Sequence, residues 1–279
     1  MKKSIVFLLF ILFSESSFSQ SSEIGIMLGV SSYKGDLNGS LFNPNSFHPA
    51  VGVLYRHCYN NHWSLKFGIN YGTVSGDDSQ SDDPFQQYRN LSFTSSILEL
   101  EGQYEFNFFP FQTANRTTPG TPFLFLGLAV FKFNPKAELD GTDYSLQPLG
   151  TEGQGTPGYP DRKKYKRVQV SFPFGGGYKF RLSNRFGVTI EAGARKSTTD
   201  YLDDVSKTYA KKDVLLAAHG PEAVRLSDRT IDQLNDNNND RQRGDASHKD
   251  YYMFAGVTLN FTLSKRYNDT CKPFKRKLH

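Results

Sequence analysis

Strand-length stretches in which apolar and polar residues alternate recur along the whole chain. In the clearest of them, residues 98–108 read LELEGQYEFNF, with apolar side chains at nearly every even position and Glu, Gln or Asn at the odd ones. Successive side chains of a strand point to opposite faces, so this segment predicts a strand with one apolar and one charged face. Eight such segments can be placed, at residues 23–32, 47–58, 63–72, 90–108, 123–133, 167–181, 186–195 and 251–262.

The connections between these segments alternate in length along the chain. Four of them are long (33–46, 73–88, 134–166 and 202–249), and the three between them are short or intermediate (59–62, 110–122 and 182–185). Outer-membrane barrels combine short periplasmic turns with long extracellular loops. We therefore predict an all-β fold, an eight-stranded antiparallel transmembrane β-barrel of the outer membrane, over residues 21–264. A periplasmic β-sandwich is the alternative, but it would not need this asymmetry of the loops.

Both ends of the chain differ from the barrel segments. Residues 1–20 have the order of a cleavable signal peptide, with Lys2 and Lys3 before an apolar run and a small polar region. The apolar run is too short to cross a bilayer as a helix, so we predict export and an outer-membrane location. Residues 265–279 form a basic tail, predicted to be periplasmic, which is either a solvated terminus or a docking segment for an acidic partner or a membrane surface.

Composition narrows the choice of partners. The mean hydropathy of −0.53 excludes a helical-bundle membrane protein but fits a barrel, whose strands alternate. Aromatic residues make up 14% of the chain, as expected for aromatic girdles at the two membrane interfaces. A net charge of +5, spread along the chain, is too small to indicate nucleic-acid binding. Outer-membrane lipid is the first expected partner.

An eight-stranded barrel has an interior just wide enough for side chains. Because the inward positions carry both signs of charge, we predict ion pairs that neutralise one another and fill the lumen, with an ion-selective pore as the alternative. The candidate lumen residues are Arg56, Lys66, Glu99, Glu101, Glu105, Lys179, Arg181, Glu191 and Arg195.

The chain offers little for catalysis. Its six His residues are scattered, and none has metal-ligand spacing with another. A lipid-modifying enzyme would need a Ser–His pair, and His219 and His248 lie in the longest loop with Ser227 and Ser247, but their spacing defines no constellation. We predict a protein that is not an enzyme, with no catalytic, cofactor-binding or metal site and no small-molecule substrate.

Two cysteines, Cys58 and Cys271, are predicted to form a disulfide, because exported chains are oxidised and both lie at the expected periplasmic end. The alternative is two free thiols.

Several motifs resemble the PorG family, outer-membrane barrel subunits of the type IX secretion system of Bacteroidetes. They are YKGDLN at 33–38, LGTEGQG at 149–155, FPFGGG at 172–177, TDYLDDVS at 199–206 and the eighth strand through Cys271. The motif residues taken as candidate sites are Tyr33, Gly35, Asp36, Leu37, Asp200, Tyr201, Leu202, Asp203 and Asp204.

This resemblance implies a non-enzymatic component of the secretion machinery that contacts a periplasmic ring of the PorK lipoprotein and PorN. The basic tail and residues 110–122 would then be docking surfaces. The alternative is a stand-alone barrel, similar to OmpA or OmpX, whose outer loops bind surfaces or ligands. The resemblance assigns no role to the long loop 202–249.

Overall fold

The chain folds as a row of long strands with small helices near one end. The computed structural model describes residues 21–113, 118–231 and 238–263. Its strands are β1 (Ser21–Lys34), β2 (His48–Cys58), β3 (Trp63–Asp77), β4 (Ser92–Asn107), β5 (Gly120–Leu139), β6 (Thr142–Ser145), β7 (Val168–Arg181), β8 (Phe186–Ser197) and β9 (Tyr251–Thr262).

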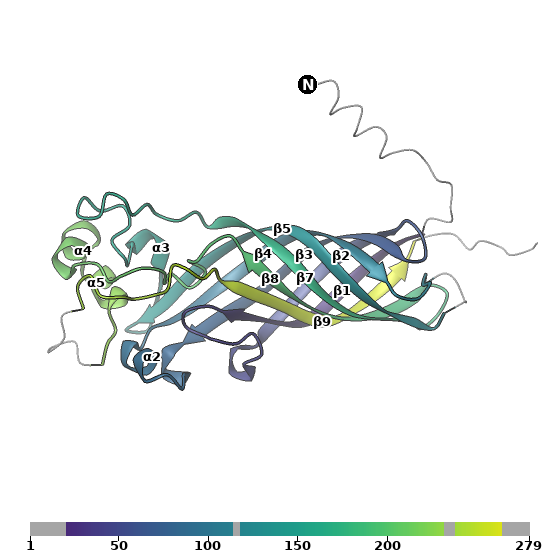
Figure 1. The fold of residues 1–279 in the computed structure, drawn as a ribbon, viewed down its shortest axis with the longest axis horizontal. Coiled ribbons are helices and arrows are strands. Elements are labelled where there is room, and N and C mark those ends of the chain that lie inside the picture. The colour runs from purple at the N-terminus through teal and green to yellow at the C-terminus, as the bar shows by residue number, and fades with distance from the viewer. Residues whose placement is uncertain (1–20, 114–117, 232–237, 264–279) are drawn as a thin grey trace, which may run out of the picture.

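Eight of these strands close into a barrel. Each wall strand pairs antiparallel with its neighbours, β1 pairs with both β2 and β9, and β4 pairs with β5, so the sheet has no open edge in the wall. Short β6 is a hairpin partner of β5 outside the ring. Figure 1 shows the tilted strands of an elongated barrel, with the helices gathered at one end. The predicted fold, a closed eight-stranded antiparallel barrel, is confirmed.

Two wall strands run at least five residues further than predicted at their C-terminal ends. β3 continues to Asp77 and β5 to Leu139, both toward the end that carries the helices. Inward side chains such as Val74 and Ala137 stay buried there, whereas outward positions such as Ser75 and Lys136 are polar. The pattern of apolar outward residues stops before the wall does, which is why the sequence predicts shorter strands.

Residues 123–133 are apolar at both odd and even positions, so alternation alone does not orient this predicted strand. In β5 the phenylalanines Phe123, Phe125, Phe131 and Phe133 face the lumen and are buried. The intervening Leu124, Leu126, Leu128 and Val130 face outward and are exposed, which is the arrangement of a wall strand in an apolar surrounding.

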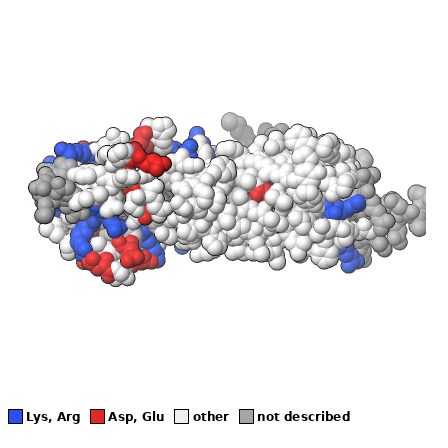
Figure 2. Space-filling view, turned by 90° about the horizontal axis from the view of Figure 1, so that it is seen from below, with Lys and Arg blue, Asp and Glu red and all other residues white. Residues whose placement is uncertain are grey.

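The outside of the barrel is an apolar band. Outward side chains such as Leu28 and Leu126 are about two-thirds exposed, at 66% and 67%. Figure 2 shows the same surface as almost free of charge, with Lys, Arg, Asp and Glu gathered toward the two ends. Exposed apolar surface of this extent marks a contact with lipid or protein rather than with water. Other exposed members of the band are Ile26, Val53, Phe67, Ile69, Leu98, Leu100, Phe172, Phe174, Ile190, Val257 and Leu259.

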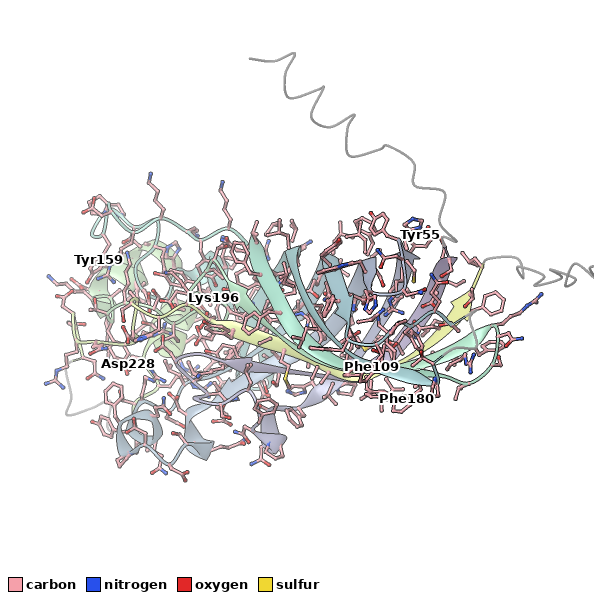
Figure 3. The ribbon with its side chains drawn as sticks, turned by 45° about the vertical axis from the view of Figure 1, so that its right-hand side comes forward. Tyr55, Phe109, Tyr159, Phe180, Lys196 and Asp228 are labelled. Carbon is pink, nitrogen blue, oxygen red and sulfur yellow. The ribbon has the colours of Figure 1, made fainter. Side chains whose placement is uncertain are left out.

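The long connections fold over one end of the barrel, and we call them the cap: residues 35–47, 78–91, 140–167 and 198–250, apart from 232–237. Figure 3 places Tyr159 and Asp228 within the cap, and Tyr55 and Phe180 on the barrel. Its helices are η1 (Pro44–Ser46), η2 (Asp78–Gln80), α2 (Pro84–Arg89), α3 (Leu146–Leu149), α4 (Lys212–His219) and α5 (Pro221–Ser227). Among the described residues, no helix is both long and apolar enough to cross a membrane.

Candidate functional site

The lumen contains two groups of ion pairs. Nearer the short turns, Arg56 donates to Glu23 at 2.9 Å and to Glu105 at 2.8 Å, and Lys179 Nζ lies 2.6 Å from Glu105. These groups come from β1, β2, β4 and β7, so they join opposite sides of the wall. Their side chains are at most 3% exposed, and the lumen at this level is filled by protein.

The second group lies nearer the cap. Lys66 Nζ is 2.6 Å from Glu191 and 3.6 Å from Glu101, and Arg195 reaches Glu101 at 2.9 Å and Glu99 at 3.4 Å. Five carboxylates therefore meet four cations in the described lumen, counting Glu23 and the first group. Neutral donors complete the set, because the Tyr252 hydroxyl and the Asn70 amide donate to Glu99 at 2.6 and 2.9 Å.

The structure brings eight of the nine lumen candidates into these groups. The ninth, Arg181, is half-buried at the last residue of β7, where the wall ends. Sequence reasoning missed Glu23, although its place on the same face as Gly25 and opposite Ile24 indicated an inward side chain. Apart from Glu23, the inward face of this segment holds Gly25, Met27, Gly29 and Ser31, so it lacks the repeated charges that mark the inward face of β4.

The cap joins the motif segments that are far apart in the sequence. The Tyr33 hydroxyl donates to the Asp203 carboxyl group, and the Leu202 amide donates to Asp250 at 2.8 Å. The Asp36 carboxyl group accepts hydrogen bonds from the Asp245 amide at 3.0 and 3.2 Å. Residues 33–37 and 200–204 are therefore held against each other and against the start of β9.

A glycine is required between Tyr33 and Asp36. A Cβ atom at Gly35 would lie 2.1 Å from the Tyr33 hydroxyl and 2.2 Å from Asp250 Oδ1. Tyr33 is fully buried and cannot move aside, so only glycine lets the first motif approach the second.

The third outer loop joins the same cluster through Glu152. Its carboxylate accepts from the backbone amides of Ser206 and Lys207 at 2.9 and 3.0 Å and lies 3.2 Å from Arg243. Asp204, in the left-handed region at φ 68°, accepts from Tyr165 at 2.7 Å and from Thr151.

Arg89 connects the second loop to this cluster. It binds Asp78 through two hydrogen bonds of 2.7 Å and donates to the carbonyl groups of Arg243 and Asp36 at 2.6 and 2.8 Å. All four long loops therefore share one buried polar network.

Acidic groups outnumber cations in this network, and most of them are deprived of water. Burial raises the pKa of Asp36 and of Asp204 to about 6, and that of Asp200 to about 7. Burial also raises the pKa of Asp203 and of Asp250. The charge of the cap therefore changes with pH near neutrality.

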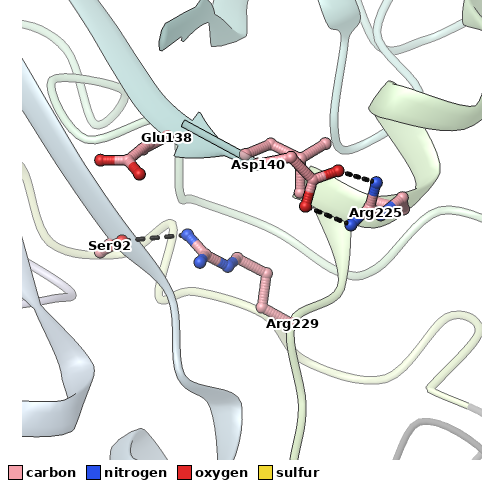
Figure 4. Close-up of a pocket in the computed structure, with 6 residues that line it drawn as sticks. Ser92, Glu138, Asp140, Arg225 and Arg229 are labelled. Carbon is pink, nitrogen blue, oxygen red and sulfur yellow. Dashed lines mark hydrogen bonds and ion pairs between the residues drawn. The ribbon is translucent and has the colours of Figure 1, made fainter. Parts of the chain in front are cut away.

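A polar pocket of about 510 Å³ opens at the edge of the cap, between the ends of β4 and β5 and helix α5. Figure 4 shows Arg225 bound to Asp140 through two hydrogen bonds, of 2.6 and 3.0 Å, and Arg229 donating to Ser92 at 3.1 Å. Glu138 stands on the other side of the pocket. Two carboxylates and two guanidinium groups line the pocket, and their charges cancel. The pocket is therefore selective neither for an anion nor for a cation.

The remaining predicted groups take these positions. Cys58 is a buried, free thiol at the last residue of β2, and Cys271 lies outside the described residues, among which no disulfide is found. His248 Nδ1 contacts both Asp245 and Ser247, so one nitrogen serves both partners and no proton relay is formed. In the described part of the chain, no three His, Cys, Asp or Glu side chains are arranged to hold a metal ion. Residues 1–20 and 265–279 lie outside the described residues.

Several solved structures are similar to this chain. Neisserial surface protein A has 6% sequence identity and a TM-score of 0.42, covering 88% of this chain and 99% of that protein. Ail, the attachment invasion locus protein of Yersinia pestis, has 14% identity and a TM-score of 0.38, with coverage of 88% and 100%. The outer membrane protein OprG from Pseudomonas aeruginosa has 8% identity and a TM-score of 0.35, with coverage of 87% and 97%.

No curated protein sequence matches the chain. A family model described as a domain of unknown function, DUF6089, matches residues 2–148, which is more than half of the chain. The matched region includes the YKGDLN motif, β1 to β6 and the three lumen glutamates of β4. The chain belongs to the DUF6089 family.

Proposed function

We propose that this protein is a non-enzymatic barrel of the outer membrane that serves as a structural component of the type IX secretion machinery. One observation carries the structural role: the lumen is filled by buried ion pairs beneath a cap in which all four long loops are bonded together. A barrel filled in this way acts through its wall and its two ends rather than through its interior.

Placement in the membrane is supported by the apolar band. Large side chains around the ring are exposed there, while charged side chains gather near the ends (Figure 2). Lipid stabilises such an apolar surface. A closed barrel can lie in lipid because its wall leaves no backbone N–H or C=O group unpaired. The first described residue, Ser21, lies at the end of the barrel that carries the short turns. An exported chain reaches the outer membrane from the periplasm, so we place this end in the periplasm.

The secretion role is supported by the resemblance to PorG and by what the motifs do in this fold. Motif residues 200–204 contact both 33–37, through the Tyr33–Asp203 hydrogen bond, and 149–155, through the Thr151–Asp204 hydrogen bond, although these segments are far apart in sequence. Residues that contact one another in this way form a single unit, so the motifs that carry the resemblance belong to one cap in this protein.

The turn end fits a partner with an acidic surface. Its described residues, 59–62, 108–113, 118–119 and 182–185, include no Asp or Glu, and Arg185 is exposed among them. The basic segment 265–279 follows the last wall strand at this end. We propose that this end contacts a periplasmic ring of PorK- and PorN-like proteins.

Copurification tests this proposal. An affinity tag placed at the exposed Gly39, far from the turn end, would be used to isolate the full chain from its own cell envelope in mild detergent. We expect ring proteins to copurify, and to be lost when residues 265–279 are removed. A version with residues 207–248 shortened is the matched control and should keep them. Isolation of the barrel alone, with normal secretion in a strain lacking the gene, would refute the secretion role and favour the stand-alone barrel.

A further inference from the structure

A shallow groove of about 660 Å³ crosses the outside of the barrel where β7, β8, β9 and β1 lie side by side. Large apolar side chains such as Leu28, Ile190 and Val257 line it together with Tyr178 and Phe180. Its floor consists of small residues: Gly29, Gly176, Gly177, Ala192, Ala255 and Gly256.

Strand packing explains part of this floor but not all of it. A Cβ atom at Gly29 would lie 2.0 Å from the Ala255 carbonyl oxygen, and one at Gly256 would lie 2.6 Å from that of Leu28. Close backbone approach therefore accounts for these glycines. Ala192 and Ala255 are different, because they face outward in register with each other, where the neighbouring positions hold Ile190 and Val257. The small side chains at these outward positions leave the hollow.

Two lysines stand above the groove on the same strands. Lys34 of β1 and Lys196 of β8 both pair in register with Tyr251 of β9, and both are exposed. Among the residues that the structure describes, no carboxylate forms an ion pair with either ammonium group. Figure 3 shows Lys196 where the wall meets the cap, with Phe180 of the groove toward the other end of the barrel.

The spacing between the lysines and the groove follows from the strands. Lys196 is four residues beyond Ala192, and Lys34 is four residues beyond Val30, so all four side chains face outward. Four residues of strand span roughly 13 Å, at about 3.3 Å per residue. A cationic patch thus lies one headgroup length from an apolar hollow, at the edge of the apolar band.

One acidic residue also lines the groove. Glu191 faces the lumen, and its carboxylate is bound to Lys66 at 2.6 Å. The ammonium of Lys66 lies against this carboxylate from inside the lumen, so the acidic group beside the groove is ion-paired.

We propose that this face binds one phosphate-bearing lipid of the surrounding membrane, with its phosphate between Lys34 and Lys196 and an acyl chain in the groove. The charge of the two lysines selects an anionic headgroup, and the hollow selects an acyl chain. The proposal rests on the membrane placement given above and is independent of the secretion role.

The other side of the barrel supplies a matched control. Lys132 and Lys136 of β5 are also exposed beyond the apolar band. The outward residues below them are Leu128 and Val130, which are large and prominent rather than small. Both sides therefore carry exposed lysines. Of these two pairs, Lys34 and Lys196 lie next to a hollow, and Lys132 and Lys136 do not.

Native mass spectrometry of the full chain in nonionic detergent tests the proposal, with bis-phosphorylated lipid A as the probe and dephosphorylated lipid A as the comparison. We expect one molecule of the phosphorylated lipid to stay bound. The double variant K34E/K196E should weaken its binding by roughly 10-fold to 30-fold, because each lysine near a membrane surface contributes about 1 kcal/mol. The double variant K132E/K136E should bind as the unchanged protein does.

A third variant tests the groove without changing charge. Ala192→Phe would fill the hollow from outside, and we expect it to reduce lipid retention while the phosphate preference persists. Each variant would first be checked for folding by its heat-dependent gel mobility, and K34Q/K196Q would replace K34E/K196E if the charge reversal prevents folding. Equal binding of the two lipids, full retention by A192F, or a second copy of the chain in place of lipid would overturn the proposal. Copurification with ring proteins would be unaffected by either outcome.

Discussion

Arg195 shows how much of this barrel depends on single residues in the lumen. Its side chain is buried and lies within 2.9 Å of Glu101 and 3.4 Å of Glu99. Two carboxylates in a closed, water-poor space need a cation nearby, and the alternative of leaving them unpaired is strongly unfavourable. A buried pair of this kind holds opposite wall strands in one register.

Replacing Arg195 with Met should therefore destabilise the barrel by about 3–5 kcal/mol, since Glu99 loses the cation paired with it and Glu101 keeps only the more distant Lys66, while the side-chain volume is nearly kept. Urea unfolding in lipid vesicles, followed by tryptophan fluorescence of Trp63, would measure the change. Lys132→Met, on the outside of the wall, is the control and should shift the free energy of unfolding by less than about 0.5 kcal/mol. An unchanged midpoint for R195M would show that the lumen charges do not stabilise the fold.

The inward charges could be predicted because side chains alternate between the two faces of a strand, so an apolar outward face identifies the residues of the inward face. The ion-pair partner of each charge could not be predicted, since pairing across the lumen depends on the tilt and register of strands distant in sequence. Arg56 illustrates this, because it joins Glu23 and Glu105 from two different strands. Arg181, at the last residue of its strand, shows that alternation gives the face of a residue but not its depth.

At the scale of elements, the cap is the part of the molecule that sequence reasoning described least. Its loops carry motifs but no regular repeat, and their contacts are between segments such as 33–37 and 200–204. Periodicity cannot reveal these contacts. The resemblance singled out the residues, and the structure shows the physical reason for them: a fully buried tyrosine, a glycine without room for a side chain, and carboxyl groups bonded to backbone amides.

Gly35→Ala should loosen the cap while the wall stays intact, because the new methyl group would overlap the Tyr33 hydroxyl and Asp250. We expect the free energy of local opening to fall by roughly 1–3 kcal/mol, which limited proteolysis of residues 202–249 would detect. Gly39→Ala provides the comparison, since a Cβ atom there has no neighbour within 4 Å. Equal cleavage of both variants would contradict this account of the motif.

The cap should also be less stable at higher pH. In the folded state the pKa of Asp36 and Asp204 is about 6 and that of Asp200 about 7, above the ordinary value of 3.8. Groups with a raised pKa hold their protons more tightly when folded, so their stabilisation is complete below about pH 4 and is lost as the pH rises through 6 to 7.

Hydrogen exchange of the cap amides at pH 5 and pH 8, corrected for the intrinsic rate, would measure this effect. We expect protection to drop by at least about tenfold between the two values, while the wall amides keep theirs. Asp200→Asn removes one titrating group and should reduce the difference. Greater protection at pH 8 would reverse the sign and show that the carboxylates are held in their charged form.

At the scale of the whole described barrel, side chains fill the lumen at two levels, which argues against a channel. Conduction needs a continuous water-filled path, whereas here the side chains of four cations and five carboxylates span the lumen and the cap lies over one end. Purified protein in a planar bilayer should therefore show no stable conductance steps at either polarity.

Removing the cap loops alone should leave the barrel without conductance, because the ion pairs remain. Replacing Glu99, Glu101 and Arg195 together with Ala should open a path and produce measurable current, provided that the variant keeps its heat-dependent gel mobility. Steady conductance by the unchanged protein, at a level that scales with salt concentration, would mean that the ion pairs line a pore rather than fill one.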